Sequence, residues 1–95
     1  MYVALVNWTD QGTKNIKETT RRADAFLHLA EKTECKVHQL LYTMGPHDIV
    51  TVLEAPNDRA ASALILSVSS LGNVRAVTMP AFTKEEMGGI LRDLP

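Results

Sequence analysis

Apolar residues occupy both alternating sets of positions in two segments of this chain that have the composition of β-strands. Residues 2–6 read Tyr-Val-Ala-Leu-Val and residues 49–53 read Ile-Val-Thr-Val-Leu, with almost no polar alternation. An antiparallel strand with one face in water alternates apolar and polar side chains. Two helices cover only one face of a sheet, and 95 residues leave little to cover the other. We therefore expect a second copy of the chain to cover it, in a homodimer or a higher oligomer built from dimers.

Length and charge restrict the class of protein further. A chain of 95 residues is long enough for one domain, spanning residues 1–95. Ten basic and eleven acidic residues give a net charge of −1, so we expect neither nucleic acid nor a membrane surface as a partner. The single cysteine excludes an intrachain disulfide, and no run approaches the ~20 apolar residues that span a bilayer. We expect a soluble, cytoplasmic protein.

Hydrophobic periodicity and turn residues divide the chain into strands and helices. A polar turn at residues 9–12 separates the first strand from a long helix, and Gly45-Pro46 separates the second and third strands as a hairpin. Pro46 fits poorly in a two-residue turn, so the hairpin loop should contain three or four residues, and its register stays open. The predicted strands are residues 2–8, 36–43, 48–54 and 73–79, and the predicted helices are residues 14–33, 58–71 and 84–92.

Local signals mark several of these boundaries. Asn57 or Asp58 can cap the second helix, and Gly72 directly after it is a helix-stop glycine. Thr83 and Glu86 form a capping box at the start of the last helix. The resulting order, βαββαβ with an appended C-terminal helix, is the α+β ferredoxin-like arrangement. That core is complete without the last helix, so we expect the last helix to pack on a neighbouring subunit or to cap a sheet end.

Four segments resemble the GYD domain family: residues 5–12, 44–50, 54–58 and 70–75. The resemblance covers nearly the whole chain and implies a dimeric α+β barrel, in agreement with the two-faced strands. The namesake motif combines a glycine, a tyrosine and an aspartate at the second hairpin. Gly45 and Asp48 match this motif, while His47 stands where a tyrosine is expected. The resemblance therefore implies no role for an aromatic hydroxyl in this chain. The resemblance implies no established reaction.

The hairpin residues His47 and Asp48 are the first candidates for a ligand-binding site. In a regular strand their side chains would point to opposite faces, so they could not orient one another as a catalytic pair. An aspartate at a hairpin more often accepts hydrogen bonds from turn amides, which we take as the better interpretation. Histidine titrates near neutral pH, which keeps His47 as a candidate.

Polar and aromatic strand residues are the other candidates for ligand binding, since a pocket combines an apolar wall with a few placed polar groups. Asn7 and Trp8 point to opposite faces, so only one of them can face any single cavity. For Asn7, packing and ligand binding are equally supported, and for Trp8 packing is favoured. The remaining strand candidates are Tyr42 and Arg75.

Other groups of polar residues point to no chemistry. Asp24, His28 and Glu31 share a helix face at a spacing that can hold a metal, but a solvated flank is the better interpretation. The basic residues of the first helix, such as Arg21 and Arg22, are interleaved with Glu18, which favours a solvated face. We therefore expect no metal and no cofactor.

Two classes of function are consistent with these observations. The first is an oligomeric module that binds a small molecule or a protein partner. The second is a cofactor-free enzyme acting on a small organic molecule, by analogy with the monooxygenases and isomerases that share the dimeric barrel. The sequence contains no paired acid and base at a recognisable spacing, so catalytic residues are not identified. A polar cavity that contains His47 or Asp48 together with a second titratable group would favour the enzyme, and a cavity lined only by aliphatic residues would favour binding or pure assembly.

Overall fold

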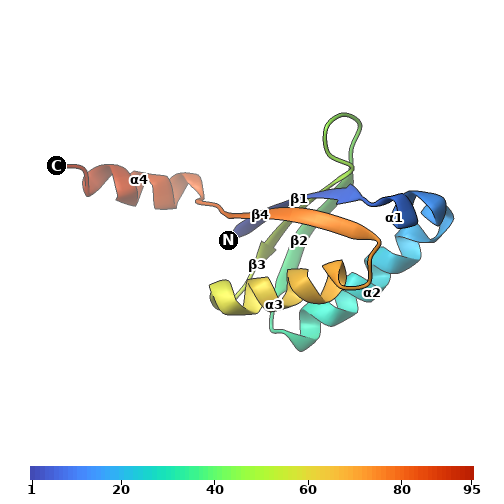
Figure 1. The fold of residues 1–95 in the computed structure, drawn as a ribbon. Helices are drawn as coiled ribbons and strands as arrows, with labels where there is room; N and C mark the ends of the chain where they lie inside the picture. Colours follow the sequence, from blue (N-terminus) through green and yellow to red (C-terminus); the bar gives the residue numbers. More distant parts are fainter.

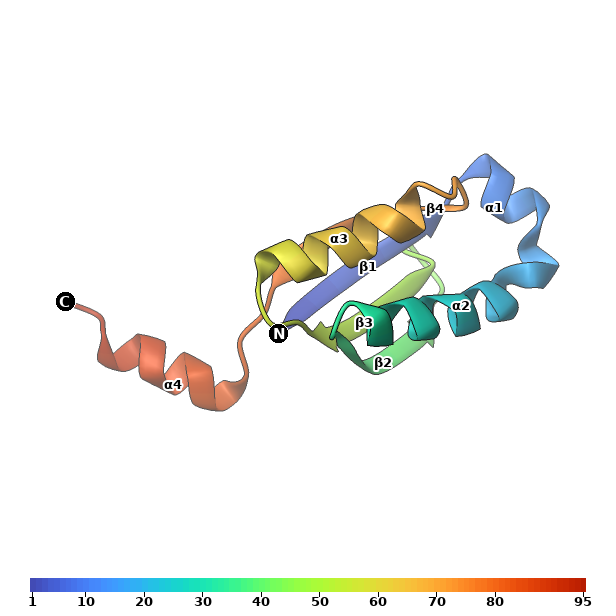
Figure 2. The same ribbon diagram turned by 90° about the horizontal axis from the view of Figure 1, so that it is seen from below.

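A computed structural model describes residues 1–95 and contains one four-stranded antiparallel sheet (Figure 1). The strand order is β2-β3-β1-β4, so the two strands that are first and third in the chain lie in the middle. Both long helices lie on the same face of the sheet (Figures 1 and 2). This arrangement confirms the predicted ferredoxin-like α+β fold. The strands are β1 (Tyr2–Trp8), β2 (Lys36–Tyr42), β3 (Ile49–Glu54) and β4 (Val74–Pro80), and the long helices are α2 (Thr19–Lys32) and α3 (Asp58–Ser69).

The register assigns each strand residue to one of the two faces. On the helix-covered face Ala4 and Leu53 are fully buried, and Thr51 is nearly so. The opposite face carries no helix (Figure 1), yet two rows of mostly apolar residues cross it. Strand pairing places these rows side by side: Leu41, Val50, Leu5 and Val77 in one, and Gln39, Val52, Val3 and Met79 in the other. We call these eight residues the open sheet face.

The hydrophobic core lies between the sheet and the two helices. Phe26 and Ala30 of α2 and Ala61 and Leu64 of α3 pack with Leu53 and its neighbours. The expected helix caps are present, since Asn57 accepts a hydrogen bond from the amide of Ala60, and Gly72 has a φ of +87°. Burial of a large aliphatic side chain such as Leu64 contributes about 1.5–3 kcal/mol to folding. The core of the single chain is therefore built on one face of the sheet only.

The region before α2 differs from the prediction of a polar turn followed by one helix over residues 14–33. It contains a short helix α1 (Asp10–Lys14) capped by Thr9, then the 3-10 turn η1 (Ile16–Glu18), and only then α2. Because the helix is interrupted, Ile16 is out of phase with the buried residues of α2, Phe26 and Ala30, and is exposed. The break turns the chain around the end of the sheet, where α1 contacts the loop after α3 (Figure 2).

The β2–β3 hairpin is also longer than a tight turn. The strands end at Tyr42 and begin again at Ile49, and the amide of Thr43 donates to the carbonyl of Asp48 at 2.8 Å. Four residues, 44–47, lie beyond this bond, within the predicted length. A β-bulge between Val37 and Gln39 shifts the register of β2. Gly45 has a φ of +122°, a conformation that residues with a Cβ rarely adopt.

The last helix, α4 (Lys84–Arg92), extends away from the rest of the chain (Figures 1 and 2). Its predicted capping box is present, with Thr83 and Glu86 each accepting from the other's backbone amide. These hydrogen bonds hold the pKa of Glu86 below its usual value. One side of the helix is apolar and exposed, including Met87, Ile90 and Leu91. None of the helices in the chain has the length and apolar character needed to cross a bilayer.

Candidate functional site

Three of the five predicted site residues come together where the hairpin loop meets the end of β1. The side-chain amide of Asn7 donates to the carbonyl of Pro46 at 2.9 Å, and its Oδ1 lies 3.1 Å from Nδ1 of His47. Asp48 accepts from the backbone amide of Trp8 at 3.0 Å through Oδ2, which lies 3.5 Å from Nδ2 of Asn7. Asn7 thus contacts both hairpin residues, which precede β3 and do not follow strand alternation. We call Asn7, His47 and Asp48 the hairpin cluster.

The other two predicted site residues, Arg75 and Tyr42, lie on opposite faces of the sheet. Arg75 pairs with Asn7 in the β1–β4 register, so it lies beside the hairpin cluster on the same face as Asn7. Tyr42 is on the helix-covered side, where its ring stacks with that of Trp8 at a centroid distance of 6.4 Å. Its hydroxyl donates to the carbonyl of Thr19, the first residue of α2. Tyr42 therefore cannot share a pocket with His47.

The hairpin cluster has the geometry of a structural connection. The His47 ring faces the amide oxygen of Asn7 instead of a carboxylate, so Nδ1 of His47 is not oriented by an acidic side chain. The Asp48 carboxylate accepts from an amide of β1, not from the turn amides that the sequence suggested. The reason is topological: the Asp48 amide donates to the carbonyl of Val6, which extends the β1–β3 ladder into the loop. Asp48 therefore fastens the loop to the central strand.

Replacing Asp48 by alanine should lower the free energy of unfolding by about 1–3 kcal/mol, because the amide of Trp8 would lose a charge-assisted hydrogen bond. Asp48→Asn keeps an acceptor oxygen and should lose less than half as much. Urea denaturation of the two variants measures the difference. Equal and negligible losses in both variants would contradict a fastening role for this carboxylate.

A second set of contacts joins the end of β1 to the loop after α3. Thr9 donates from its amide to the carbonyl of Asn73 at 3.0 Å and from its hydroxyl to the carbonyl of Gly72. The side chain of Gln11 donates to the carbonyl of Leu71 at 3.1 Å. Gly12 lies against the backbone of Asn73, and no side chain would fit between them. We call residues 9–12 and 71–73 the clamp, which fixes α1 at one end of the space between α2 and α3.

A cavity of about 500 Å³ occupies this space, between α2, α3 and the covered face of the sheet. This volume lies in the range of small-molecule sites. Thirteen of its twenty lining residues are hydrophobic, so its wall is mostly apolar. The lining residues that define the position of the cavity are Phe26 and Leu29 of α2, Ile65 and Val68 of α3, and Val6 and Ala76 of the sheet.

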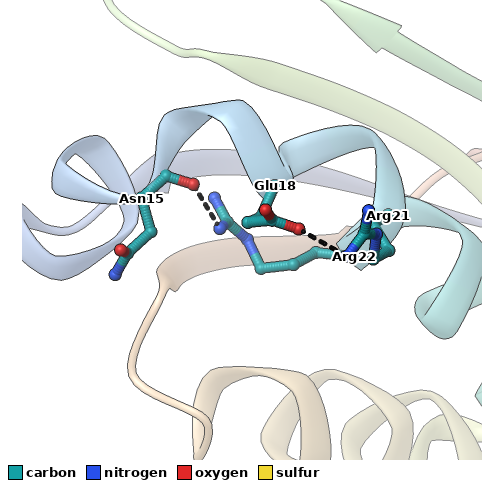
Figure 3. A network of polar contacts seen from close by, with 4 residues as sticks. All are labelled: Asn15, Glu18, Arg21 and Arg22. Atoms are coloured by element: carbon teal, nitrogen blue, oxygen red, sulfur yellow. Dashed lines mark hydrogen bonds and ion pairs between the residues drawn. The ribbon is translucent and has the colours of Figure 1, made fainter.

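The polar groups of the cavity wall are mostly engaged in the fold. The Thr51 hydroxyl donates to the carbonyl of Gln39, and that of Tyr42 is held by Thr19. Arg22 lies half-buried at the clamp end, where its guanidinium donates to the carbonyl of Asn15 at 2.9 Å (Figure 3) and to that of Gly12 at 3.3 Å. No aspartate or glutamate is among the lining residues.

The sequence reasoning missed this cavity and the position of Arg22. Arg22 was placed on a solvated face beside Glu18, but Glu18 pairs with the exposed Arg21 at 3.2 Å (Figure 3). A signal was present, because Arg22, Phe26 and Leu29 follow i, i+4, i+7 spacing and share one helix face. Asp24, His28 and Glu31 lie exposed on α2, and no three metal-ligating side chains come together in the chain.

Similarity to known proteins identifies the family of this chain. The chain matches the GYD domain over residues 2–91, which includes the hairpin cluster, the clamp and the lining of the cavity. No curated protein matches the chain. The matched segment covers the complete sheet, both long helices and nearly all of α4. The chain therefore belongs to the GYD domain family.

Proposed function

We propose that this domain binds a small, largely apolar molecule in the cavity between α2, α3 and the sheet. The observation that carries the proposal is the cavity itself, with its volume of about 500 Å³ and its mostly apolar wall. Concave sites with a mostly apolar wall are where proteins bind small molecules. A space of this size between two helices and a sheet is a feature that a ligand would fill.

The character of the wall supports binding over catalysis. His47 and Asp48 lie outside the cavity, and its titratable lining residues are Arg22, His28, Lys32 and Tyr42. General acid–base catalysis needs a positioned proton donor or acceptor with a pKa suited to the reaction. His28 is exposed and no carboxylate of the lining stands beside it, so the cavity offers no oriented acid–base pair.

We also propose that two copies pair through the open sheet face. Leu41 and Val77 of this face are 53% and 59% exposed in the single chain. Large exposed apolar patches on a soluble domain mark interaction sites. The cavity is on the opposite side of the sheet, so pairing would leave it accessible. The projecting helix α4, with its exposed apolar side, would then pack on the partner.

Filling the cavity tests the binding proposal. The probe is N-phenyl-1-naphthylamine, a neutral dye whose fluorescence rises in apolar surroundings. Ala23 lines the cavity, and Ala23→Phe should weaken dye binding by about tenfold or more, equivalent to about 1.4 kcal/mol. The control is Ala63→Phe, which adds the same ring at an exposed position of α3 outside the lining.

The control keeps the wild-type affinity if the dye occupies the cavity. Far-ultraviolet circular dichroism establishes that both variants are folded. Absence of dye binding to the wild-type protein, or an equal loss in the two folded variants, would count against the cavity as a binding site.

A further inference from the structure

We propose that the cavity selects an amphipathic anion, with an apolar body between the helices and a carboxylate or similar acid group at Arg22. This inference rests on the proposed function and adds the chemical class of the ligand. It follows from the charge of the lining, the environment of Arg22 and the position of Arg22 relative to the apolar wall.

The charged residues of the lining, Arg22 and Lys32, are both cationic. Arg22, Lys32 and His28 all come from α2, whereas no aspartate or glutamate lines the cavity. The chain as a whole carries eleven acidic and ten basic residues, so the lining is more positive than the chain as a whole. A cleft with apolar walls and charges of one sign concentrates its electric field and attracts ligands of the opposite sign.

Arg22 differs from its neighbour Arg21 in its electrostatic environment. Arg21 is 84% exposed and pairs with the carboxylate of Glu18 (Figure 3), whereas Arg22 is half-buried and its guanidinium donates to the backbone carbonyls of Asn15 and Gly12. A guanidinium has five N–H donors, and these two hydrogen bonds use one from each terminal nitrogen. The remaining donors and the full positive charge are available to an acid group.

The clamp occupies acceptors that would otherwise repel an anion at this end of the cavity. The carbonyls of Leu71 and Gly72, after the carboxyl end of α3, accept from Gln11 and Thr9. The carbonyls of Gly12 and Asn15 are held by Arg22 itself. Four backbone oxygens near the clamp therefore have donors.

The apolar wall begins directly beside this charge. Phe26 and Leu29 follow Arg22 on the same face of α2, and a rise of 1.5 Å per residue places Leu29 about 10 Å along the helix from Arg22. An acid group at Arg22 thus leaves an attached hydrocarbon chain or ring system in contact with the apolar part of the wall. Carboxylates are the natural partners, because guanidinium binds them in a bidentate manner.

Competition against the bound neutral dye tests the inference with three molecules of equal chain length: decanoate, decanol and decyltrimethylammonium. Each is used at physiological salt, the two ions below their micellar concentrations and decanol below its solubility limit. We expect decanoate to bind about tenfold more tightly than decanol, the effect of one charge-assisted hydrogen bond, and the cation to bind most weakly. Decanol is the more apolar molecule, so a cavity without a cationic contact would prefer it.

Two matched substitutions locate the preference. Arg22→Gln should abolish the preference for decanoate over decanol, while Arg21→Gln removes the same charge from the exposed neighbour and should keep it. A wild-type protein that binds decanol as tightly as decanoate would overturn the inference while leaving the binding proposal intact. Equal effects of the two substitutions would overturn the role of Arg22. If neither the dye nor any of the three molecules binds, the proposed function itself fails. If the Arg22→Gln protein does not fold, the comparison of decanoate with decanol in the wild-type protein still tests the preference for an anion.

Discussion

Replacing Gly12 by alanine should lower the free energy of unfolding by about 3 kcal/mol or more. A Cβ on Gly12 would lie 2.0 Å from the carbonyl oxygen of Asn73 and 3.0 Å from its carbonyl carbon. Both atoms belong to the backbone, so no side-chain rotation relieves the overlap. Overpacking costs about 1–3 kcal/mol, and separating the two segments would also weaken the hydrogen bonds of Thr9 and Gln11, about 1 kcal/mol each.

Gly88→Ala is the matched control, since Gly88 lies within helix α4 and the nearest atom to an added Cβ is in the Arg92 side chain at 3.9 Å. Alanine is favoured over glycine in a helix by about 1 kcal/mol, so this variant should keep or raise stability. Urea denaturation followed by circular dichroism measures both. A Gly12→Ala protein as stable as Gly88→Ala would mean that the clamp is not needed for folding.

The fold was predictable because its determinants are local. The caps at Asn57 and Thr83, the stop at Gly72 and the apolar runs of the strands each depend on a few neighbouring residues, and each is present in the structure. The segment at residues 9–18 was not predictable in this way. Its short helix is held by hydrogen bonds of Thr9 and Gln11 to residues 71–73, about sixty positions away. Tertiary hydrogen bonds decided the local conformation there.

The candidate site was predictable only in part, because its residues come together through strand pairing and not through local sequence. The grouping of Asn7 with His47 and Asp48 depends on the pairing of β1 with β3, which the βαββαβ order implies. The separation of Tyr42 depends on the hairpin register, in which Tyr42 pairs with Ile49, and the sequence left that register open.

The cavity depends on how far apart two helices lie on a sheet. Small side chains such as Ala23 and Ala76 leave space only if the helices do not close over them. Helix spacing is a property of the whole packing arrangement, so periodicity along one helix carries no information on it. The one local signal, Arg22 on the face of Phe26 and Leu29, indicates a polar group near the core without showing the space beside it.

Val77→Lys should convert the proposed dimer into a monomer, raising the dissociation constant by about a hundredfold or more. Val77 lies on edge strand β4 in the row that includes Leu5 and is 59% exposed in the single chain. If the open sheet face is the interface, the substitution places an ammonium group from each copy in an apolar contact, and an unpaired buried charge costs several kcal/mol. In the separate chain the lysine is solvated, so its stability should change by less than about 0.5 kcal/mol. Sedimentation velocity across micromolar concentrations measures the association.

Leu66→Lys separates this explanation from a general effect of added charge. Leu66 is 68% exposed on α3, on the helix side of the sheet, so the same change is made on a surface outside the proposed interface. The Leu66→Lys protein should sediment as the wild type does, while Val77→Lys sediments as a monomer. A wild-type chain that is already monomeric at these concentrations would contradict the pairing. Dimers that persist in Val77→Lys and dissociate in Leu66→Lys would move the interface to the helical face, and the apolar rows of the sheet would then need a different partner.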